Sequence, residues 1–249
     1  MLSPTEPIAA VCPAPVQRPV LRMRWEALTY LHWDLDPDVV AARLPAGLEP
    51  DVLHGRAYVG LIPFRMARIG VGPAGVPLPQ GRFPETNVRT YVVGPDGGRG
   101  VYFHSLDVTR LAPAVVARTT YRLPYCWSRM AIGSRGTRVA YRAWRRWPGP
   151  QGAQSHVVIE VGDPLAPDER TPLDDFLSAR WSLYEALPSG AIVRARVDHD
   201  PWPLHVARVV HLADDLVAAS GYPASLGPPA HVRYGGDVEV RVGPPRRVG

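Results

Sequence analysis

The chain has 249 residues, of which 46% are hydrophobic and 20% charged, so it is long and apolar enough to bury a globular core. Its 29 prolines and 23 glycines interrupt the sequence about every ten residues, which favours many short strands joined by turns over long helices. The net charge is +5 and all 28 basic residues are arginine, but the arginines are spread along the chain, so we expect no nucleic-acid partner. The segment 141–147 alternates basic and aromatic residues, which suits either the stacking of nucleobases or an ordinary two-faced strand with extended arginines.

The two cysteines and the apolar runs limit the possible compartments. Cys12 lies in a proline-rich segment and Cys126 in a predicted strand, so they form neither a disulfide framework nor a zinc knuckle. No apolar run approaches the roughly 20 residues of a membrane span, and prolines break the N-terminus where a signal peptide needs a continuous apolar core. We therefore expect a cytoplasmic protein that makes no membrane contact.

The first third of the chain predicts an extended arm followed by strands. Five prolines in residues 1–21 exclude a helix, and we expect this arm to be either disordered or packed on another subunit of a homo-oligomer. The remaining residues, 22–249, contain no linker and predict a single domain. The expected elements are a strand at 21–33, a short helix from Asp36 to about 45, a hairpin of 48–53 with 57–66, and a loop at 69–81 that could arch over a cavity.

The segment 83–108 predicts a β-hairpin around the turn Gly94-Pro95-Asp96-Gly97-Gly98. Strand side chains alternate between faces, so Glu85, Asn87, Arg89 and Tyr91 share one face of its first strand. A carboxylate, an amide, a guanidinium and a phenol therefore form one row. On pattern alone the row is either a solvated sheet face or the lining of a barrel interior.

The second half of the chain predicts further strands and three short helices. The strands are expected at 125–132, 137–147, 155–161, 181–187, 192–198, 205–211 and 231–242, and the helices at 111–121, 171–180 and 214–220. The fold class is therefore mainly β, with a few short peripheral helices.

Other groupings of reactive residues give weaker evidence of function. Asp198, His199, Asp200 and His205 do not guarantee three converging ligands, so we expect no metal. His104, Ser105 and Asp107 have the residue types of a triad, but neighbouring strand residues point to opposite faces. No glycine-rich phosphate loop precedes a helix, and we expect no cofactor.

Five spaced motifs resemble a known family: LHWDLDPDVVAARLPAGLEPDVLHGRAYVGLIPFRM, FPETNVRTYV, VYFHSLD, ARTTYRLPY and VDHDPWPL. In this order they resemble the uncharacterised YqjF-like bacterial proteins of the acetoacetate decarboxylase-like superfamily. The resemblance implies an antiparallel β-barrel or cone with a central cavity and a homo-oligomer. It also implies that the polar row faces the interior.

The same resemblance argues against the superfamily's lysine chemistry. Acetoacetate decarboxylases form a Schiff base on a lysine that corresponds here to Tyr125 or Cys126, and the chain contains no lysine. The superfamily's acidic residue corresponds to Glu85. Its arginine falls near Trp25-Glu26, so Arg24 and Arg89 are the candidates to replace that positive charge.

We therefore expect a lysine-independent acid/base enzyme acting on a small carbonyl, keto-acid or polyketide-like substrate, by decarboxylation, dehydration, cyclisation or isomerisation. Glu85 would move the proton, Arg89 would bind a carboxylate or enolate oxygen, and Tyr125 would donate a hydrogen bond. The residues expected to contact the substrate are Asn87, Tyr91, Arg24, Phe103, Cys126 and His199. The alternative is a non-catalytic small-molecule-binding protein that has kept the cavity.

Overall fold

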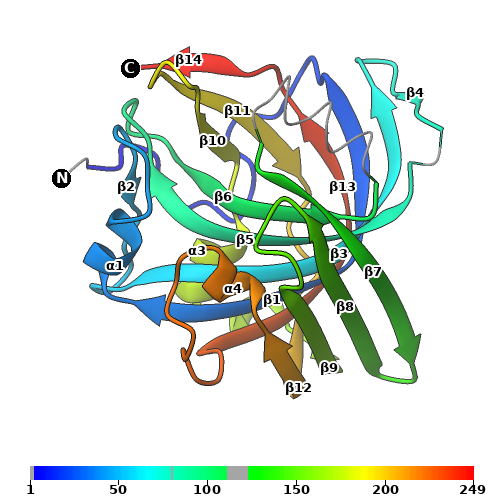
Figure 1. Cartoon of the computed structure of the whole chain (residues 1–249). Helices are drawn as coiled ribbons and strands as arrows, with labels where there is room; N and C mark the ends of the chain where they lie inside the picture. The colour runs from blue at the N-terminus through cyan, green and yellow to red at the C-terminus, as the bar shows by residue number, and fades with distance from the viewer. Residues whose placement is uncertain (1–2, 80, 111–122) are drawn as a thin grey trace.

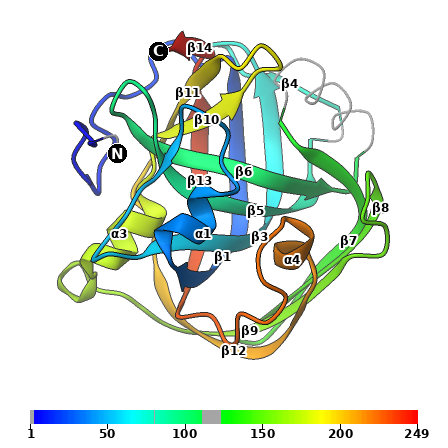
Figure 2. The ribbon, with the colours of Figure 1, turned by 60° about the vertical axis from the view of Figure 1, so that its left-hand side comes forward.

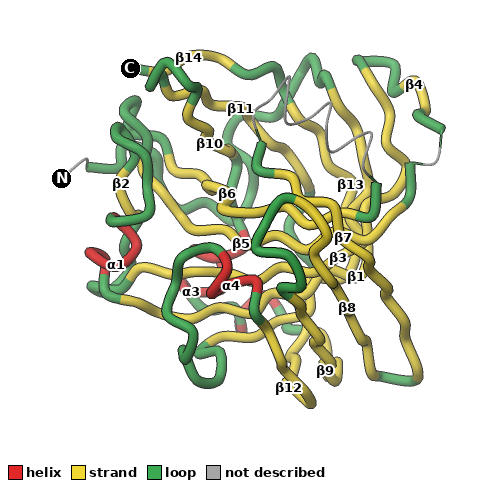
Figure 3. The backbone as a smooth tube through the Cα atoms, in the orientation of Figure 1, coloured by secondary structure: helices red, strands yellow, loops and turns green. Residues whose placement is uncertain are grey.

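The computed structural model describes residues 3–79, 81–110 and 123–249 and consists mainly of β-strands (Figures 1 and 3). The strands are β1 (Leu21–Leu35), β2 (Glu49–Pro50), β3 (Ala57–Val71), β4 (Val76–Pro77), β5 (Phe83–Val93), β6 (Arg99–Val108), β7 (Tyr125–Arg135), β8 (Arg138–Trp147), β9 (Gln154–Pro164), β10 (Ser182–Ala186), β11 (Ile192–His199), β12 (His205–Asp214), β13 (His231–Val242) and β14 (Arg246–Val248). The helices are α1 (Pro37–Ala41), the 3-10 helix η1 (Pro167–Glu169), α3 (Pro172–Ser178) and α4 (Leu216–Ala219). None of the helices described is long and apolar enough to cross a membrane.

One 14-stranded sheet forms the molecule, and its pairings close into two rings that share a wall. The first ring runs β6–β5–β3–β1–β13–β11–β10 and closes where β10 pairs in parallel with β6. The second ring leaves β6 through its parallel pairing with β7 and returns through β8, β9 and β12 to β13. Figure 2 shows β5 and β6, which belong to both rings, crossing the middle of the molecule.

The two rings share β6, β5, β3, β1 and β13, and β5 is buried on both faces because each face lines a different ring. In β5 ten of the eleven positions are buried, a pattern that a sheet with one solvated face does not give. The core inside the second ring includes Leu31, Val59, Leu61, Val88, Val139, Tyr141 and Ile159. The core inside the first ring includes Tyr30, Ile62, Phe64, Phe83, Val197 and Trp202. The interior row predicted on β5 therefore belongs to the first ring.

Local sequence signals explain the short helices. The side chain of Asp36 accepts a hydrogen bond from the Asp38 backbone N–H at 2.9 Å, and Pro37 begins α1. Thr171 and Asp174 form a capping box at the start of α3, where Pro172 occupies the first helical position. These starts match the helix positions that the sequence predicts. The helix predicted at 111–121 lies outside the described residues.

Two predictions about strand pairing were wrong. β2 pairs with β5, and in place of the predicted hairpin of 48–53 with 57–66 the structure has an isolated bridge between Leu53 and Arg56. β3 extends into the predicted loop 69–81 and pairs there with β4. Two pairings, β10 with β6 and β6 with β7, are parallel, and the other pairings described are antiparallel, so the sheet is largely antiparallel as the resemblance implies. Short or long-range pairings of this kind leave no periodic signal in the sequence.

The N-terminal arm packs on its own domain over the described residues 3–20, which corrects the expectation of a disordered or exchanged arm. The Thr5 backbone N–H donates to Gly97 O at 2.9 Å, and the indole N–H of Trp181 donates to Ala9 O at 2.8 Å. Cys12 and Val16 are buried. The arm has no regular secondary structure, as its prolines predict, and it lies on the same side of the molecule as the C-terminus (Figure 2).

Candidate functional site

The polar row of β5 is buried inside the first ring. The exposed fractions of Glu85, Asn87, Arg89 and Tyr91 are 3%, 4%, 6% and 0%. Their cross-strand partners on β3 include Phe64 opposite Glu85, and cross-strand partners share a face of the sheet. The row that the pattern placed on one face therefore lies in a water-poor interior, as the resemblance implies, and polar groups interact most strongly there.

Glu85 is an acid whose ionisation the interior disfavours. Desolvation raises the pKa of Glu85 to about 8, the hydrogen bond with the Asn87 side chain partly offsets this rise, and the charge of Asp107 adds to it. Tyr125 lies at the start of β7, opposite Leu106, and its pKa is raised by burial and then by the neighbouring Glu85 carboxyl. The carboxyl and the phenol are therefore near enough to influence one another, and both favour their protonated forms.

Arg89 points along the row towards Tyr91. Its Nε and Nη2 donate to the Tyr91 phenol oxygen at 3.3 and 3.2 Å, and Nη2 also donates to Leu177 O at 3.3 Å. The guanidinium also lies over the Tyr30 ring, 5.5 Å from its centroid. Within the described chain no carboxylate lies within 4.0 Å of Arg89, and residues 1, 2, 80 and 111–122 contain neither Asp nor Glu. A buried arginine with neutral acceptors alone is suited to binding an anion.

Two histidines that the sequence analysis did not single out continue this network. His32 Nε2 lies 2.6 Å from the Tyr91 oxygen, and the His32 and His231 rings are 5.6 Å apart. His231 Nε2 lies 2.8 Å from Asp174 Oδ1. Burial lowers the pKa of His32 well below its usual range, and the nearby positive charges lower it further. Neutral His32 can therefore donate or accept a hydrogen bond without adding charge to the interior.

A second buried arginine, Arg180, lies against the other aromatic residues of the row. Its guanidinium is 4.8 Å from the Tyr91 ring centroid and 4.2 Å from that of Phe176. It hydrogen-bonds to Asp51, whose other carboxylate oxygen binds Arg99. One carboxylate thus serves two guanidiniums, which leaves the region around Arg89 and Arg180 with an excess of positive charge.

Several buried polar atoms of this interior have no partner in the described structure. They are Glu85 Oε2, Asn87 Oδ1, His32 Nδ1, His231 Nδ1 and Arg180 Nη2. Buried groups of this kind normally bind protein, water or a ligand, since an unsatisfied group costs about 1–3 kcal/mol. The set contains acceptors and a cationic donor, so it can receive a small molecule that carries both an acidic group and a hydrogen-bond donor.

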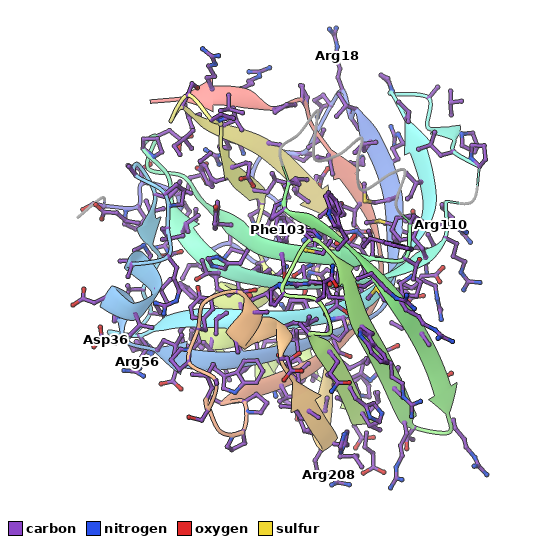
Figure 4. The ribbon with its side chains drawn as sticks, in the orientation of Figure 1. Arg18, Asp36, Arg56, Phe103, Arg110 and Arg208 are labelled. Atoms are coloured by element: carbon purple, nitrogen blue, oxygen red, sulfur yellow. The ribbon has the colours of Figure 1, made fainter. Side chains whose placement is uncertain are left out.

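The remaining predicted residues divide between this interior and other places. Phe103 is the partner of Arg89 across the strand pair and lies near the middle of the molecule (Figure 4). His199 is buried beside Trp181 and Trp202, and its pKa is lowered to about 4 by desolvation, with Arg89 contributing. Both therefore border the row.

Arg24 and Cys126 lie elsewhere, which corrects their assignment to the substrate site. The Arg24 guanidinium makes surface ion pairs with Asp237 and Glu239, each at 3.0 Å. Cys126 is the cross-strand partner of Asp107 and therefore faces the second ring, on the opposite side of the sheet from Glu85. Strand alternation thus places Arg24 at the surface and Cys126 on the face of the sheet that lines the second ring.

Two cavities of the described structure lie away from the row. One of about 170 Å³ is lined by Trp33, Leu212, Asp214 and neighbours, and one of about 510 Å³ by Glu26, Arg68, Pro77 and neighbours. Since neither includes Glu85, its position at a cavity stays a prediction. Among the described residues, no three His, Cys, Asp or Glu side chains converge as a metal site would require.

Comparisons with known proteins agree with this architecture. The family DUF2071, described as an uncharacterized conserved protein, matches residues 22–238. The chain is 29% identical over 203 residues to "Uncharacterized protein YqjF" of Bacillus subtilis (strain 168), covering 81% of this chain and 82% of that protein. The enduracididine biosynthesis enzyme MppR complexed with pyruvate superposes with a TM-score of 0.63 at 14% identity, covering 95% of this chain and 93% of the other. The acetoacetate decarboxylase of Legionella pneumophila gives a TM-score of 0.60 at 14% identity, with 95% and 92% coverage.

Proposed function

The chain belongs to the DUF2071 family and has an acetoacetate decarboxylase-like fold, and from this premise we propose that it is a lysine-independent acid/base enzyme for a small carbonyl compound bearing a carboxylate. The observation that carries the proposal is that one row contains both Glu85, a buried acid with a pKa of about 8, and Arg89, a buried cation without a carboxylate partner. Both lie on one face of β5. The pyruvate bound to MppR, a neighbour in fold, is a molecule of this chemical class.

The geometry suits proton transfer at a carbon next to a carbonyl. Arg89 binds the substrate carboxylate, and this fixes the substrate along the row. Glu85 takes a proton in its ionised form or gives one in its acid form, and a pKa near neutrality makes both forms accessible. The Tyr125 phenol and the Asn87 amide donate hydrogen bonds to the enolate oxygen that develops. Loss of carbon dioxide from a β-keto acid, loss of water from a β-hydroxy carbonyl compound, aldol-type ring closure and keto–enol isomerisation each have a route through such an enolate.

The second candidate is a small-molecule-binding protein without catalysis. The absence of lysine favours it, because the chain has the fold of acetoacetate decarboxylases but no side-chain amine to form their covalent intermediate. The buried row would then serve only to hold a ligand. Both candidates predict the same ligand class and differ in turnover.

The test is to incubate the protein with pyruvate, acetoacetate and larger keto acids and to follow both binding and conversion by NMR. For the enzyme we expect conversion that Glu85→Gln lowers at least about 100-fold, with affinity changed less than about threefold. Glu185→Gln is the matched control, because Glu185 is also a buried carboxyl with a pKa of about 8 but lies on β10. Binding without conversion would favour the second candidate. If the protein neither binds nor converts these compounds, both candidates are excluded for them.

Assembly and compartment remain predictions. We propose a cytoplasmic homo-oligomer, which light scattering of the purified protein and fractionation of cells test directly. The arm contacts described above lie within one chain, so they do not require a partner subunit.

A further inference from the structure

A group of exposed tryptophans and arginines covers the outward face of the β7–β8 ribbon. The group comprises Trp127, Arg129, Arg142, Trp144, Arg146 and Trp147, and we call it the arginine–tryptophan face. The exposed fractions of its three indole-bearing residues are 36%, 56% and 45% in chain order, whereas the alternating positions Tyr141, Ala143 and Arg145 are buried. Large exposed aromatic side chains that gather in one place mark interaction sites.

Strand pairing brings the indoles and guanidiniums next to one another. Trp144 is opposite Arg129, and Trp127 is opposite Trp147, so the residues share one face of the sheet. Arg142 precedes Trp144 by two residues and points to the same side. Trp144 and Trp127 therefore each have an arginine beside them. Figure 1 shows β7 and β8 extending together to one side of the molecule.

The charge on the β7–β8 ribbon is of one sign. Residues 123–159 contain six arginines and neither Asp nor Glu, and Glu160 on the neighbouring β9 forms ion pairs with Arg138 and Arg208. Arg145 is turned inward, where it binds the buried Asp107 through Nε at 2.9 Å and Nη2 at 2.6 Å. Within the described chain, Arg129, Arg142 and Arg146 make no ion pair with a carboxylate. Arg129, Arg142 and Arg146, which are spaced apart in the sequence, thus form a local positive surface on the ribbon.

This combination fits one class of partner best. A second copy of the chain docking symmetrically through this face would bring arginines against arginines, which is unfavourable. A membrane surface accepts Trp and Arg but needs a contiguous apolar face, and here the outward positions from the indoles to the hairpin turn are the small residues Ala131, Gly133 and Ala140 and further arginines. Flat sheets with exposed aromatics and arginines stack unpaired bases and bind phosphates.

We propose that the arginine–tryptophan face binds single-stranded nucleic acid. Bases stack on Trp144 and Trp127, and phosphates contact Arg129, Arg142 and Arg146. Paired bases cannot open onto the indoles without losing their own stacking, so duplexes bind more weakly. RNA and DNA offer the same phosphates and ring faces. The proposal is independent of the interior site, which lies on β5 and faces the first ring.

The test is fluorescence anisotropy of a labelled oligothymidine and a labelled oligouridine of about 12 nucleotides, with the full chain, at about 50 and 200 mM salt. We expect binding that weakens with salt and quenches tryptophan fluorescence. Trp144→Ala lowers affinity about tenfold or more through lost stacking. Arg142→Gln lowers the salt slope by about 0.7. Arg18→Gln, which removes an exposed arginine of the N-terminal arm, changes neither.

Other results overturn the proposal. Absence of binding at the lower salt excludes it, and so does binding that Trp144→Ala leaves unchanged, because only nonspecific charge attraction then remains. Preference for anionic vesicles over the oligonucleotides points instead to a membrane partner. If light scattering shows a dimer that Trp144→Ala converts to a monomer, the face is an interface between copies. Because the substituted side chains are exposed, circular dichroism and the unfolding midpoint of each variant should match those of the wild type.

Discussion

The Arg89 guanidinium donates to the Tyr91 phenol oxygen from Nε at 3.3 Å and from Nη2 at 3.2 Å, and the described chain offers it no carboxylate. A charge in this position loses its hydration on folding and gains only neutral acceptors in return. Arg180 lies over the same Tyr91 ring, 4.8 Å from its centroid, but differs because it is paired with Asp51. The two arginines therefore respond differently to removal of their charge.

We expect Arg89→Met to leave stability unchanged or raise it by about 1 kcal/mol, because it removes an uncompensated buried charge. The same change should lower the affinity for pyruvate or acetoacetate at least about tenfold, since the carboxylate loses its cation. Arg180→Met is the matched control and should cost about 3 kcal/mol, because the buried Asp51 loses a partner. Urea unfolding and NMR titration measure both quantities. Equal destabilisation by the two variants would show that Arg89 is a structural residue.

The raised pKa of Glu85 makes stability depend on pH. Its folded-state pKa is about 8 against an ordinary value of 4.5, so the folded protein binds the proton more tightly than the unfolded chain does. This contribution is fully present below about pH 4.5, declines as the pH rises through about 8, and is absent above that. Glu185, with the same shift, adds a dependence of the same sign.

Glu85→Gln should therefore flatten part of this decline. Between about pH 5 and pH 8 we expect the stability of the wild type to fall relative to that of the variant by several kcal/mol in total, up to about 1.4 kcal/mol per pH unit. Urea unfolding of both proteins across this range measures the difference. Parallel curves would mean that Glu85 ionises normally, and the acid/base role would lose its physical basis.

The absence of lysine predicts the outcome of imine trapping. Borohydride with acetoacetate should leave the mass of the wild type unchanged, because no side-chain amine exists to form an imine. Tyr125→Lys should be trapped as a reduced adduct, since burial beside the row lowers the pKa of the new amine. Cys126→Lys is the control that should not be trapped, because position 126 faces the second ring. Trapping at position 126 alone would mean that the ancestral amine position is misassigned.

The sequence predicted the β5 row because its information is local. Alternation along residues 83–93 placed Glu85, Asn87, Arg89 and Tyr91 on one face, and the turn after them defined the hairpin. The fold class followed from the motif resemblance and from the punctuation by proline and glycine. Both kinds of signal lie within short windows of the chain.

The rest of the site depends on contacts between distant segments. His32 and His231 meet because β1 pairs with β13, and Asp174 joins them from α3. In the sequence Asp174 looked like a helix-capping acid, which it also is. The ionic contact between Asp51 and Arg180 likewise joins segments more than a hundred residues apart, and no spacing rule predicts such a pair.

The last prediction concerns the arm, which the sequence predicted to be either disordered or packed on another subunit and which contacts its own chain in the structure. Glu6 accepts from the Arg99 backbone N–H at 3.1 Å and from the Arg194 guanidinium at 2.6 Å. Arg99 also binds Asp51, so the arm is linked through Arg99 and Asp51 to Arg180 in the interior. Removing the charge of Glu6 should therefore loosen the arm without unfolding the domain.

We expect Glu6→Gln to cost about 1 kcal/mol, a modest value because the Glu6 side chain is partly exposed. Protease cleavage within residues 3–20 should become several-fold faster, while cleavage elsewhere stays slow. Arg18→Gln is the control, an exposed arm residue whose loss should change neither quantity. Because the contacts lie within one chain, the cleavage rate of the arm should not depend on protein concentration. A rate that rises on dilution would instead place the arm on another subunit, as the proline-rich sequence first indicated.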